Sequence, residues 1–168
     1  MRVALVTLLL LPAVAFADRA RDLGIPFDGT PGPRNAITDV AGVTVGHSTM
    51  IEDFPNGSAA RTGVTAVLPR GEDSVMLPVF GGSAVLNGAG EMTGTIWMEA
   101  SGFLEGPVML TTTHSVGIVF EETIKWRVNE AEPDPTGYTW SDPVVAETWG
   151  GRMNDESAFY VDGTHVAE

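Results

Sequence analysis

The chain has 168 residues, with 22 acidic and 9 basic side chains and a formal net charge of −13. A chain of this length is enough for one domain with a sizeable core. The acidic balance argues against nucleic acid or an anionic membrane surface as a partner, because both are bound through Lys and Arg. With 0 cysteines, disulfides, cysteine nucleophiles and thiolate metal ligands are excluded.

The first residues have the pattern of a secretory signal peptide. An arginine is followed by an almost wholly apolar run over residues 3–11, and Ala15 and Ala17 form an A-x-A cleavage site. The run is too short for a membrane anchor, which needs roughly 20 apolar residues. We therefore expect residues 1–17 to be removed, and residues 18–168 to be periplasmic or secreted in a bacterium.

Four short runs rich in Val, Leu, Met and Thr predict β-strands, because each is bounded by Gly or Pro. They follow an irregular opening segment in which Pro31-Gly32-Pro33 rules out regular structure. The four runs cover residues 42–48, 62–71, 74–80 and 106–113. Two stretches leave alternatives open: residues 81–95 fit a glycine-broken helix or a loop, and residues 96–104 fit a helix or a strand.

Residues 114–135 contain a clear amphipathic helix. Its apolar positions form one stripe that we expect to face the core, namely Val116, Val119, Phe120, Ile124 and Val128. Glu121 precedes Lys125 by one turn on the outer face, a pair that contributes about a few tenths of a kcal/mol. Pro133 and Pro135 end the helix. Strands followed by a helix, without a repeat or a linker, predict a single layered α/β domain.

Several familiar catalytic patterns are missing from the sequence. His47, His114 and His165 stand singly, without the paired spacing of a zinc motif, so we predict no metal site. The glycine-rich residues 87–94 lack the Walker lysine and the Rossmann spacing, so we interpret them as small residues packed tightly against a neighbouring element. No G-x-S-x-G elbow indicates a self-contained serine hydrolase triad, and nothing indicates a cofactor.

Four stretches together resemble the α-subunit of the DmpA-type family, which comprises L-aminopeptidase/D-amidase-esterases and β-peptidyl aminopeptidases. They are residues 19–52, 61–71, 78–119 and 147–155, in the order in which the family has them. The resemblance covers nearly all of the chain after the signal peptide. The signal peptide and the Trp in the E-T-W stretch are more similar to the β-peptidyl aminopeptidase branch.

The resemblance implies an N-terminal-nucleophile hydrolase with an αββα sandwich, of which this chain is the N-terminal part. Family precursors cut themselves into an α- and a β-subunit, and the new N-terminal Ser of the β-subunit attacks the substrate carbonyl, with its own α-amine as the base. An Asn farther along the α-subunit stabilises the oxyanion. Neither group is identified in this sequence, so we assign no catalytic residue. The implied partners are a small peptide or amide substrate, the chain's own β-subunit and further copies in a homo-oligomer.

The stretch at 144–155 combines a carboxylate, a large aromatic ring and two consecutive glycines. From composition alone, a solvated Glu beside a core Trp is the favoured interpretation. The resemblance reverses this preference: it implies that Glu147 binds the free amino group of the substrate by a charge-assisted hydrogen bond, and that Trp149 lines the pocket for the first residue. Gly150 and Gly151 would let the backbone turn closely beside that wall.

Two classes of function remain open. The first is an aminopeptidase or amidase that releases β-amino acid, D- or L-residues from peptides and amides with a free amine. The second is a catalytically inactive, truncated relative that keeps only the amine-binding wall. We favour the partial sequence of an enzyme, because the chain stops at Glu168 without a closing helix.

Overall fold

The computed structural model describes residues 19–168, so the signal peptide predicted over 1–17 lies outside the described residues. The opening segment, residues 19–43, consists of turns and a short 3₁₀ helix at Ile37–Asp39. The described chain then forms a main sheet of four strands and a small sheet of two strands.

The main sheet has the strand order β1-β2-β5-β6. β1 (Thr44–Asp53) and β2 (Ala59–Leu68) form a long antiparallel hairpin. β5 (Val108–Thr112) lies antiparallel to β2, and β6 (Val144–Thr148) lies parallel to β5. Parallel neighbours need a crossover connection, and the long helix α2 (Val116–Glu130) provides it.

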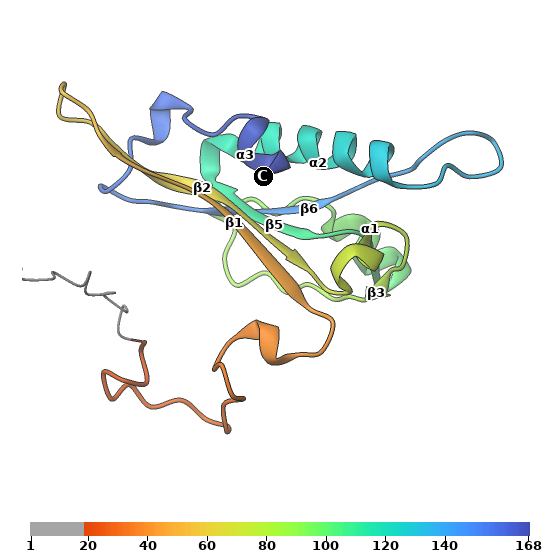
Figure 1. Ribbon diagram of the computed structural model, residues 1–168, viewed down its shortest axis with the longest axis horizontal. Helices are drawn as coiled ribbons and strands as arrows, with labels where there is room; N and C mark the ends of the chain where they lie inside the picture. Colours follow the sequence, from red (N-terminus) through yellow and green to blue (C-terminus); the bar gives the residue numbers. More distant parts are fainter. Residues whose placement is uncertain (1–18) are drawn as a thin grey trace, which may run out of the picture.

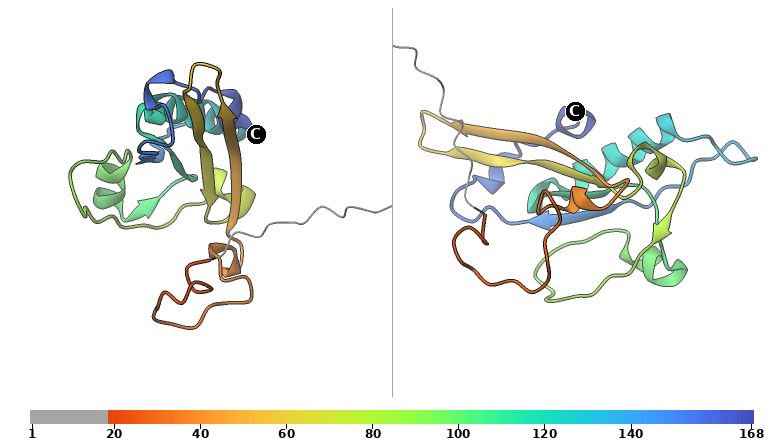
Figure 2. Two further views of the ribbon diagram at one scale, coloured as in Figure 1. Left: turned by 90° about the vertical axis from the view of Figure 1, so that its left-hand side faces the viewer. Right: turned by 60° about the horizontal axis from the view of Figure 1, so that its bottom comes forward.

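The helices are distributed unevenly about this sheet. α2 and the short C-terminal α3 (Thr164–Ala167) lie above the main sheet in Figure 1. The helix α1 (Thr95–Ser101) and the small sheet, formed by β3 (Val79–Phe80) and β4 (Phe103–Leu104), lie below it in the same view. The long hairpin projects beyond the rest of the molecule, which is clearest in the side views of Figure 2.

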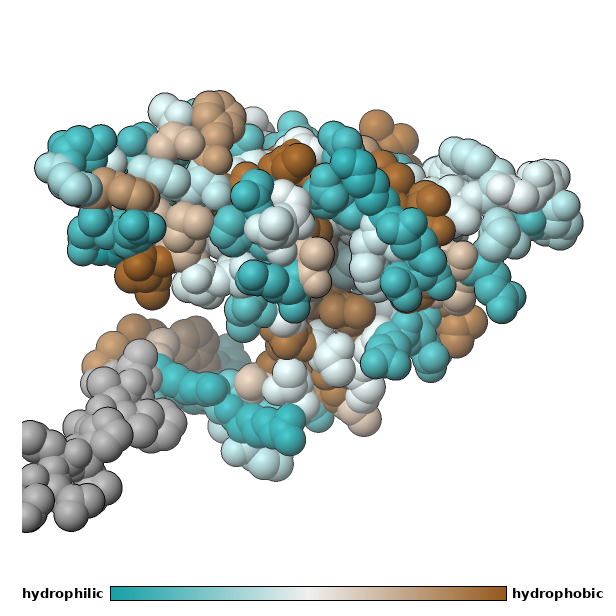
Figure 3. Space-filling view, turned by 45° about the horizontal axis from the view of Figure 1, so that its top comes forward, coloured by the Kyte–Doolittle hydropathy of each residue, from teal (hydrophilic) through white to brown (hydrophobic). Residues whose placement is uncertain are grey.

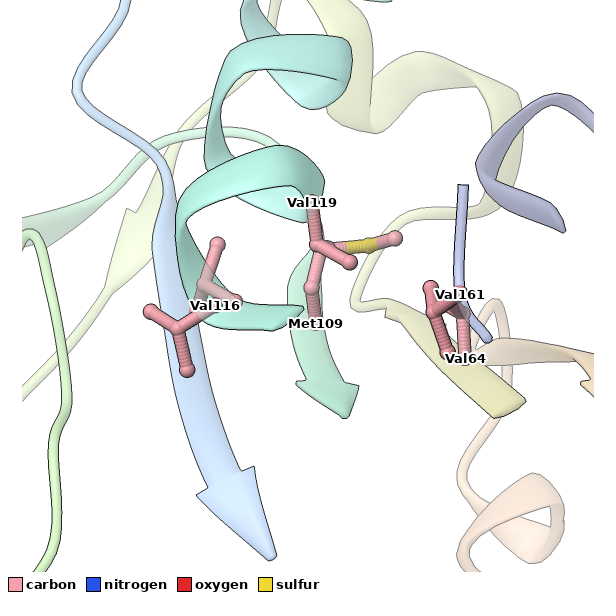
Figure 4. Packing of buried hydrophobic residues seen from close by; sticks show 6 residues of the cluster. Val64, Met109, Val116, Val119 and Val161 are labelled. Atoms are coloured by element: carbon pink, nitrogen blue, oxygen red, sulfur yellow. The ribbon is translucent and has the colours of Figure 1, made fainter. Parts of the chain in front are cut away.

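The core lies between the main sheet and α2. Its buried members come from three strands, the helix and the C-terminal segment: Val64, Met109, Val116, Val119, Val145 and Val161. Figure 4 shows Val119 of α2 beside Met109 of β5, while Val116 of the same helix lies over the neighbouring strand β6. Burying one such aliphatic side chain stabilises the fold by about 1.5–3 kcal/mol, so this cluster is what docks the helix onto the sheet.

The predicted helix is confirmed, but the residues that it buries differ in part from the predicted apolar stripe. Val116 and Val119 are buried, but Val128 is 49% exposed. Thr123 takes a core position instead, because its hydroxyl donates to the carbonyl of Val119 at 2.7 Å and leaves no unpaired polar group. Lys125 reaches the expected partner Glu121 at 2.7 Å.

The strands predicted over 42–48, 62–71 and 106–113 are confirmed, and the strand predicted over 74–80 is wrong. Gly71–Val75 forms a 3₁₀ helix, and only Val79–Phe80 pairs with another strand within the described residues. Pro78 offers no N–H to a ladder of hydrogen bonds, which explains why the apolar run does not continue as a strand.

The two ambiguous stretches and the last strand are settled by the structure. Residues 96–104 contain both alternatives, α1 and then β4, separated by Gly102 in the left-handed conformation at φ +77°. Residues 81–95 are a loop up to the start of α1. β6, which carries Glu147, was not predicted from the sequence.

Large apolar side chains remain exposed on the surface. In the space-filling view of Figure 3, hydrophobic residues are interspersed among hydrophilic ones. The most exposed lie at β3, in the following loop and on α1: Phe80 88%, Val85 82%, Leu86 96% and Ile96 85%. None of the helices in residues 19–168 is both long and apolar enough to cross a membrane.

Candidate functional site

Glu147 is the next-to-last residue of β6, the strand that runs parallel to β5. In the register of β5 and β6, Glu147 is opposite Thr111. The backbone N–H of Glu147 donates to the carbonyl of Glu91 at 3.0 Å, and Met92 forms a bridge with Ala146. The outer edge of β6 is therefore covered by the glycine-rich loop, which fixes the backbone that carries the carboxylate.

The Glu147 carboxylate is half-buried and held on two sides. The hydroxyl of Thr113, just after β5, donates a hydrogen bond to Oε2. On the other side, a Cβ placed at Gly90 would be only 2.9 Å from Oε1, so the absence of a side chain at Gly90 makes room for the carboxylate. The hydrogen bond from Thr113 therefore orients the carboxylate, and Gly90 leaves room for it.

The tight packing predicted for the glycine-rich residues 87–94 is found only at the end of that stretch: residues 87–92 are exposed, a Cβ at Gly88 would meet nothing within 4 Å, and Thr93 and Gly94 pack against the start of β6. The Thr93 hydroxyl donates to the carbonyl of Pro143 at 2.7 Å and accepts from the N–H of Val145 at 2.9 Å. Gly94 has φ +70°, and a Cβ there would lie 2.9 Å from the carbonyl oxygens of Asp142 and Pro143. This stretch is thus a structural support for the strand of Glu147.

The two consecutive glycines are explained by the turn that follows Trp149. A Cβ at Gly150 would lie 2.7 Å from the Cβ of Asn154, closer than side chains approach, and Gly151 has φ +63°. The N–H of Gly150 donates to Oε1 of Glu156 at 2.9 Å. The backbone therefore folds closely around the side chains of its own downstream segment.

Trp149 is 74% exposed at the edge of an open cavity of about 430 Å³. The cavity lies between the β1–β2 hairpin and the turn after β6, and its other lining residues include Arg61, Thr112 and Glu156. Glu147 does not line this cavity among the described residues. The structure thus places one of the two predicted binding residues in the cavity, while the role of both stays a prediction.

Sequence reasoning missed two threonines and a second glutamate at this site. Thr112 donates a hydrogen bond to Glu156 Oε2, and the adjacent Thr113 donates to Glu147 Oε2. Neighbouring residues thus anchor two different carboxylates. The available signal was the T-T-T run at the carboxyl end of a strand, the end at which open α/β sheets bind ligands.

Each of the three histidines contacts a different partner, and none of these partners is another histidine. His47 Nδ1 lies 2.9 Å from the Thr65 hydroxyl, and His165 Nδ1 lies 2.9 Å from Asp162 Oδ1. His114 Nδ1 lies 2.8 Å from the carbonyl of Glu156, with its ring stacked on Phe159. Within residues 19–168, no group of three or more His, Asp or Glu side chains is arranged to hold a metal ion.

Comparison with known proteins identifies the class of protein. Residues 35–168 match peptidase family S58. The β-peptidyl aminopeptidase BapA of Sphingosinicella microcystinivorans is 48% identical over an alignment of 169 positions, which covers 97% of this chain and 41% of that protein. This chain belongs to peptidase family S58, and it spans about two fifths of the length of such relatives.

Solved structures give the fold. The L-aminopeptidase D-Ala-esterase/amidase of Ochrobactrum anthropi, described as a variant of the Ntn hydrolase fold, is 46% identical with a TM-score of 0.79 over 89% of this chain and 42% of that chain. A Burkholderia sp. β-aminopeptidase is 42% identical with the same TM-score of 0.79, and again 89% of this chain and 42% of that chain are covered. The α/β fold of Ntn hydrolase type is confirmed, and the described residues supply one main sheet with its helices.

Proposed function

We propose that this chain is the N-terminal part of a serine-type aminopeptidase that releases N-terminal residues from peptides and amides with a free amine. Membership of peptidase family S58 and the aminopeptidase relatives support this proposal. The observation that carries it is the ordered carboxylate of Glu147 at the end of β6. β-Amino acid residues are the favoured first residues, and D- and L-residues are the other substrates to compare.

In the proposed mechanism, Glu147 accepts hydrogen bonds from the substrate ammonium and so fixes the amino end of the substrate. Trp149 forms part of the wall against which the first side chain packs. The attacking hydroxyl belongs to the N-terminal Ser of a β-subunit, which self-cleavage produces from a longer precursor. The α-amine freed by the same cleavage takes the proton from that hydroxyl.

We further propose that the enzyme is exported and that it contacts other protein chains. The sequence of residues 1–17 supports export to the periplasm or beyond. The exposed apolar side chains at β3, the following loop and α1 support further protein contacts, which we assign to the β-subunit and to copies in a homo-oligomer.

The proposal is tested with the full-length, processed protein and its Glu147→Gln variant. The amide keeps the shape of the side chain and removes its charge, and a hydrogen bond between charged groups is worth roughly 1.5–3 kcal/mol. We expect kcat/KM for β-alanyl or D-alanyl p-nitroanilide to fall by about ten- to a hundred-fold. Substrates with a blocked amine should be poor with both proteins.

Two results would overturn the proposal. Equal turnover of amine-bearing substrates by wild type and Glu147→Gln would remove Glu147 from the binding site. A full-length protein that binds such substrates without ever cleaving them would instead be an inactive, amine-binding relative.

A further inference from the structure

Thr113 occupies a position that the secondary structure fixes from both sides. It is the first residue of the 3₁₀ turn Thr113–Ser115, directly between the end of β5 and the start of α2. β5 is paired on both edges, by β2 and by β6. The backbone of Thr113 therefore has little freedom, and the Thr113 side chain is half-buried beside the end of β6.

The hydrogen bond from Thr113 orients the Glu147 carboxylate and leaves acceptor sites on its oxygens unoccupied. The Thr113 hydroxyl donates to Oε2. An ionised carboxylate has about four lone-pair sites on its two oxygens, so one donated hydrogen bond leaves sites free on both. Those sites are what a substrate ammonium requires.

The surroundings of Glu147 restrict the alternatives to this orientation. Gly90 leaves just enough room for Oε1, since an added Cβ would stand 2.9 Å away, and it offers no side chain that could bond the carboxylate. The neighbouring hydroxyl of Thr112 is already donated to Glu156. Thr113 is therefore the residue among these neighbours that sets the direction of the Glu147 carboxylate.

We infer that Thr113 is a positioning residue for amine recognition, acting through Glu147. This inference rests on the proposed function. A free Glu side chain has several rotamers, and a ligand that must select one of them binds more weakly than it binds a carboxylate already in place. Thr113 removes that cost before the substrate arrives, so its contribution belongs to binding of the amino end.

The test compares hydroxyl-free and hydroxyl-bearing side chains at position 113 in the full-length, processed protein. Thr113→Val and Thr113→Ala should raise KM for β-alanyl p-nitroanilide by about 3- to 10-fold, the range of one net hydrogen bond, with kcat within about twofold. Thr113→Ser should restore the wild-type KM. An analogous p-nitroanilide without the amino group should be cleaved at the same low rate by every variant.

Two further variants separate positioning from general stability. Thr123→Val removes another buried hydroxyl, which bonds within α2 far from Glu147 in sequence, and should lower the melting temperature without changing KM. Gly90→Ala pushes only against the tip of the Glu147 side chain, so it should raise KM with little loss of stability.

The outcomes distinguish the inference from the function on which it rests. One outcome is that Glu147→Gln lowers kcat/KM for amine-bearing substrates while Thr113→Val and Thr113→Ala leave KM unchanged. In that case the positioning role is overturned and the proposed function stands. If Glu147→Gln also has no effect, both are overturned. A KM that rises equally for Thr113→Ser and Thr113→Val would likewise contradict a role of the hydroxyl.

Discussion

The side-chain carbonyl of Asn154 accepts a hydrogen bond from the backbone N–H of Arg61 at 3.0 Å, across 93 residues of sequence. Asn154 is 7% exposed, and the next residue, Asp155, donates its N–H to the carbonyl of Ala59 at 2.9 Å. The turn that follows Trp149 is thus tied to the part of β2 that β5 does not reach. The wall of the cavity depends on these two contacts.

Replacing Asn154 by Ala should lower the free energy of unfolding by about 1–2 kcal/mol, because the N–H of Arg61 loses its partner. Thermal or denaturant unfolding measures the change. Asn129→Ala, at an exposed position in the last turn of α2, is the matched control and should stay within about 0.5 kcal/mol of wild type. Equal losses in the two variants would contradict a structural role of the Asn154 contact.

Glycine-to-alanine substitutions should have opposite signs at two positions. At Gly150 the new Cβ would meet Asn154 and Glu156 within 2.8 Å, so the turn must shift and the protein should be destabilised by about 1–3 kcal/mol. At Gly117, in the first turn of α2, an added Cβ would meet nothing within 4 Å beyond its own turn of the helix, and Ala should stabilise the helix by about 0.5–1 kcal/mol. Melting temperatures of the two variants check both signs.

The Asp162 carboxylate should make the stability of the fold depend on pH in the acid range. Hydrogen bonds from the Thr164 hydroxyl, then from the Thr164 N–H and His165, lower the pKa of Asp162 from 3.8 to about 2. Because the folded-state pKa is depressed, the stabilising contribution is present above pH 3.8 and is lost as the pH falls toward 2. Asp162→Asn should therefore show a weaker fall in melting temperature over this interval than wild type does.

The largest cause of that pKa shift can be tested separately. Thr164→Val removes the hydroxyl that Asp162 accepts at 2.6 Å and should move the pKa of Asp162 back toward 3.8. A carboxyl titration followed by NMR gives the value directly. An unchanged titration would assign the shift to the other two donors.

The signal peptide predicts a defined N-terminus after export. Expression of the full gene in a bacterium should give a periplasmic product that begins at Asp18 or within a few residues of it. N-terminal sequencing or intact mass identifies the start. A soluble cytoplasmic protein that retains Met1 would contradict the prediction.

A polypeptide restricted to these 168 residues should have no amidase or peptidase activity. By the family resemblance, the nucleophilic Ser and the oxyanion Asn lie outside this sequence, and binding without attack does not lower the barrier. Purified chain and its Glu147→Ala variant should give the same background with β-alanyl p-nitroanilide. Turnover by the wild-type sequence clearly above that background would show that the chemistry resides in these residues.

The parts of the fold that follow local rules could be predicted from the sequence. The apolar spacing of Val116 and Val119 predicted α2, and the paired glycines after Trp149 predicted a close turn. β6 was missed because its burial comes from β5 and the glycine-rich loop, which lie far away in the sequence. Periodicity within five residues carries no information about such neighbours.

The same limit applies to the site. Glu147 was singled out only through the family resemblance, and Thr113 was not singled out at all. Their contact joins residues 34 apart, and it depends on the parallel register of two strands that are separated by a helix. A run of threonines indicates polar side chains at a strand end, but the register decides which carboxylate each one meets.

The parallel pairing of β5 and β6 also has a kinetic consequence. The β1–β2 hairpin closes over a short turn, whereas β6 can join the sheet only after α2 and the loop beyond it have been traversed. Contacts that are distant in sequence form slowly, since the entropy of closing the intervening chain is lost before they stabilise anything. The strand that carries Glu147 should therefore acquire protection from hydrogen exchange later in refolding than the hairpin does.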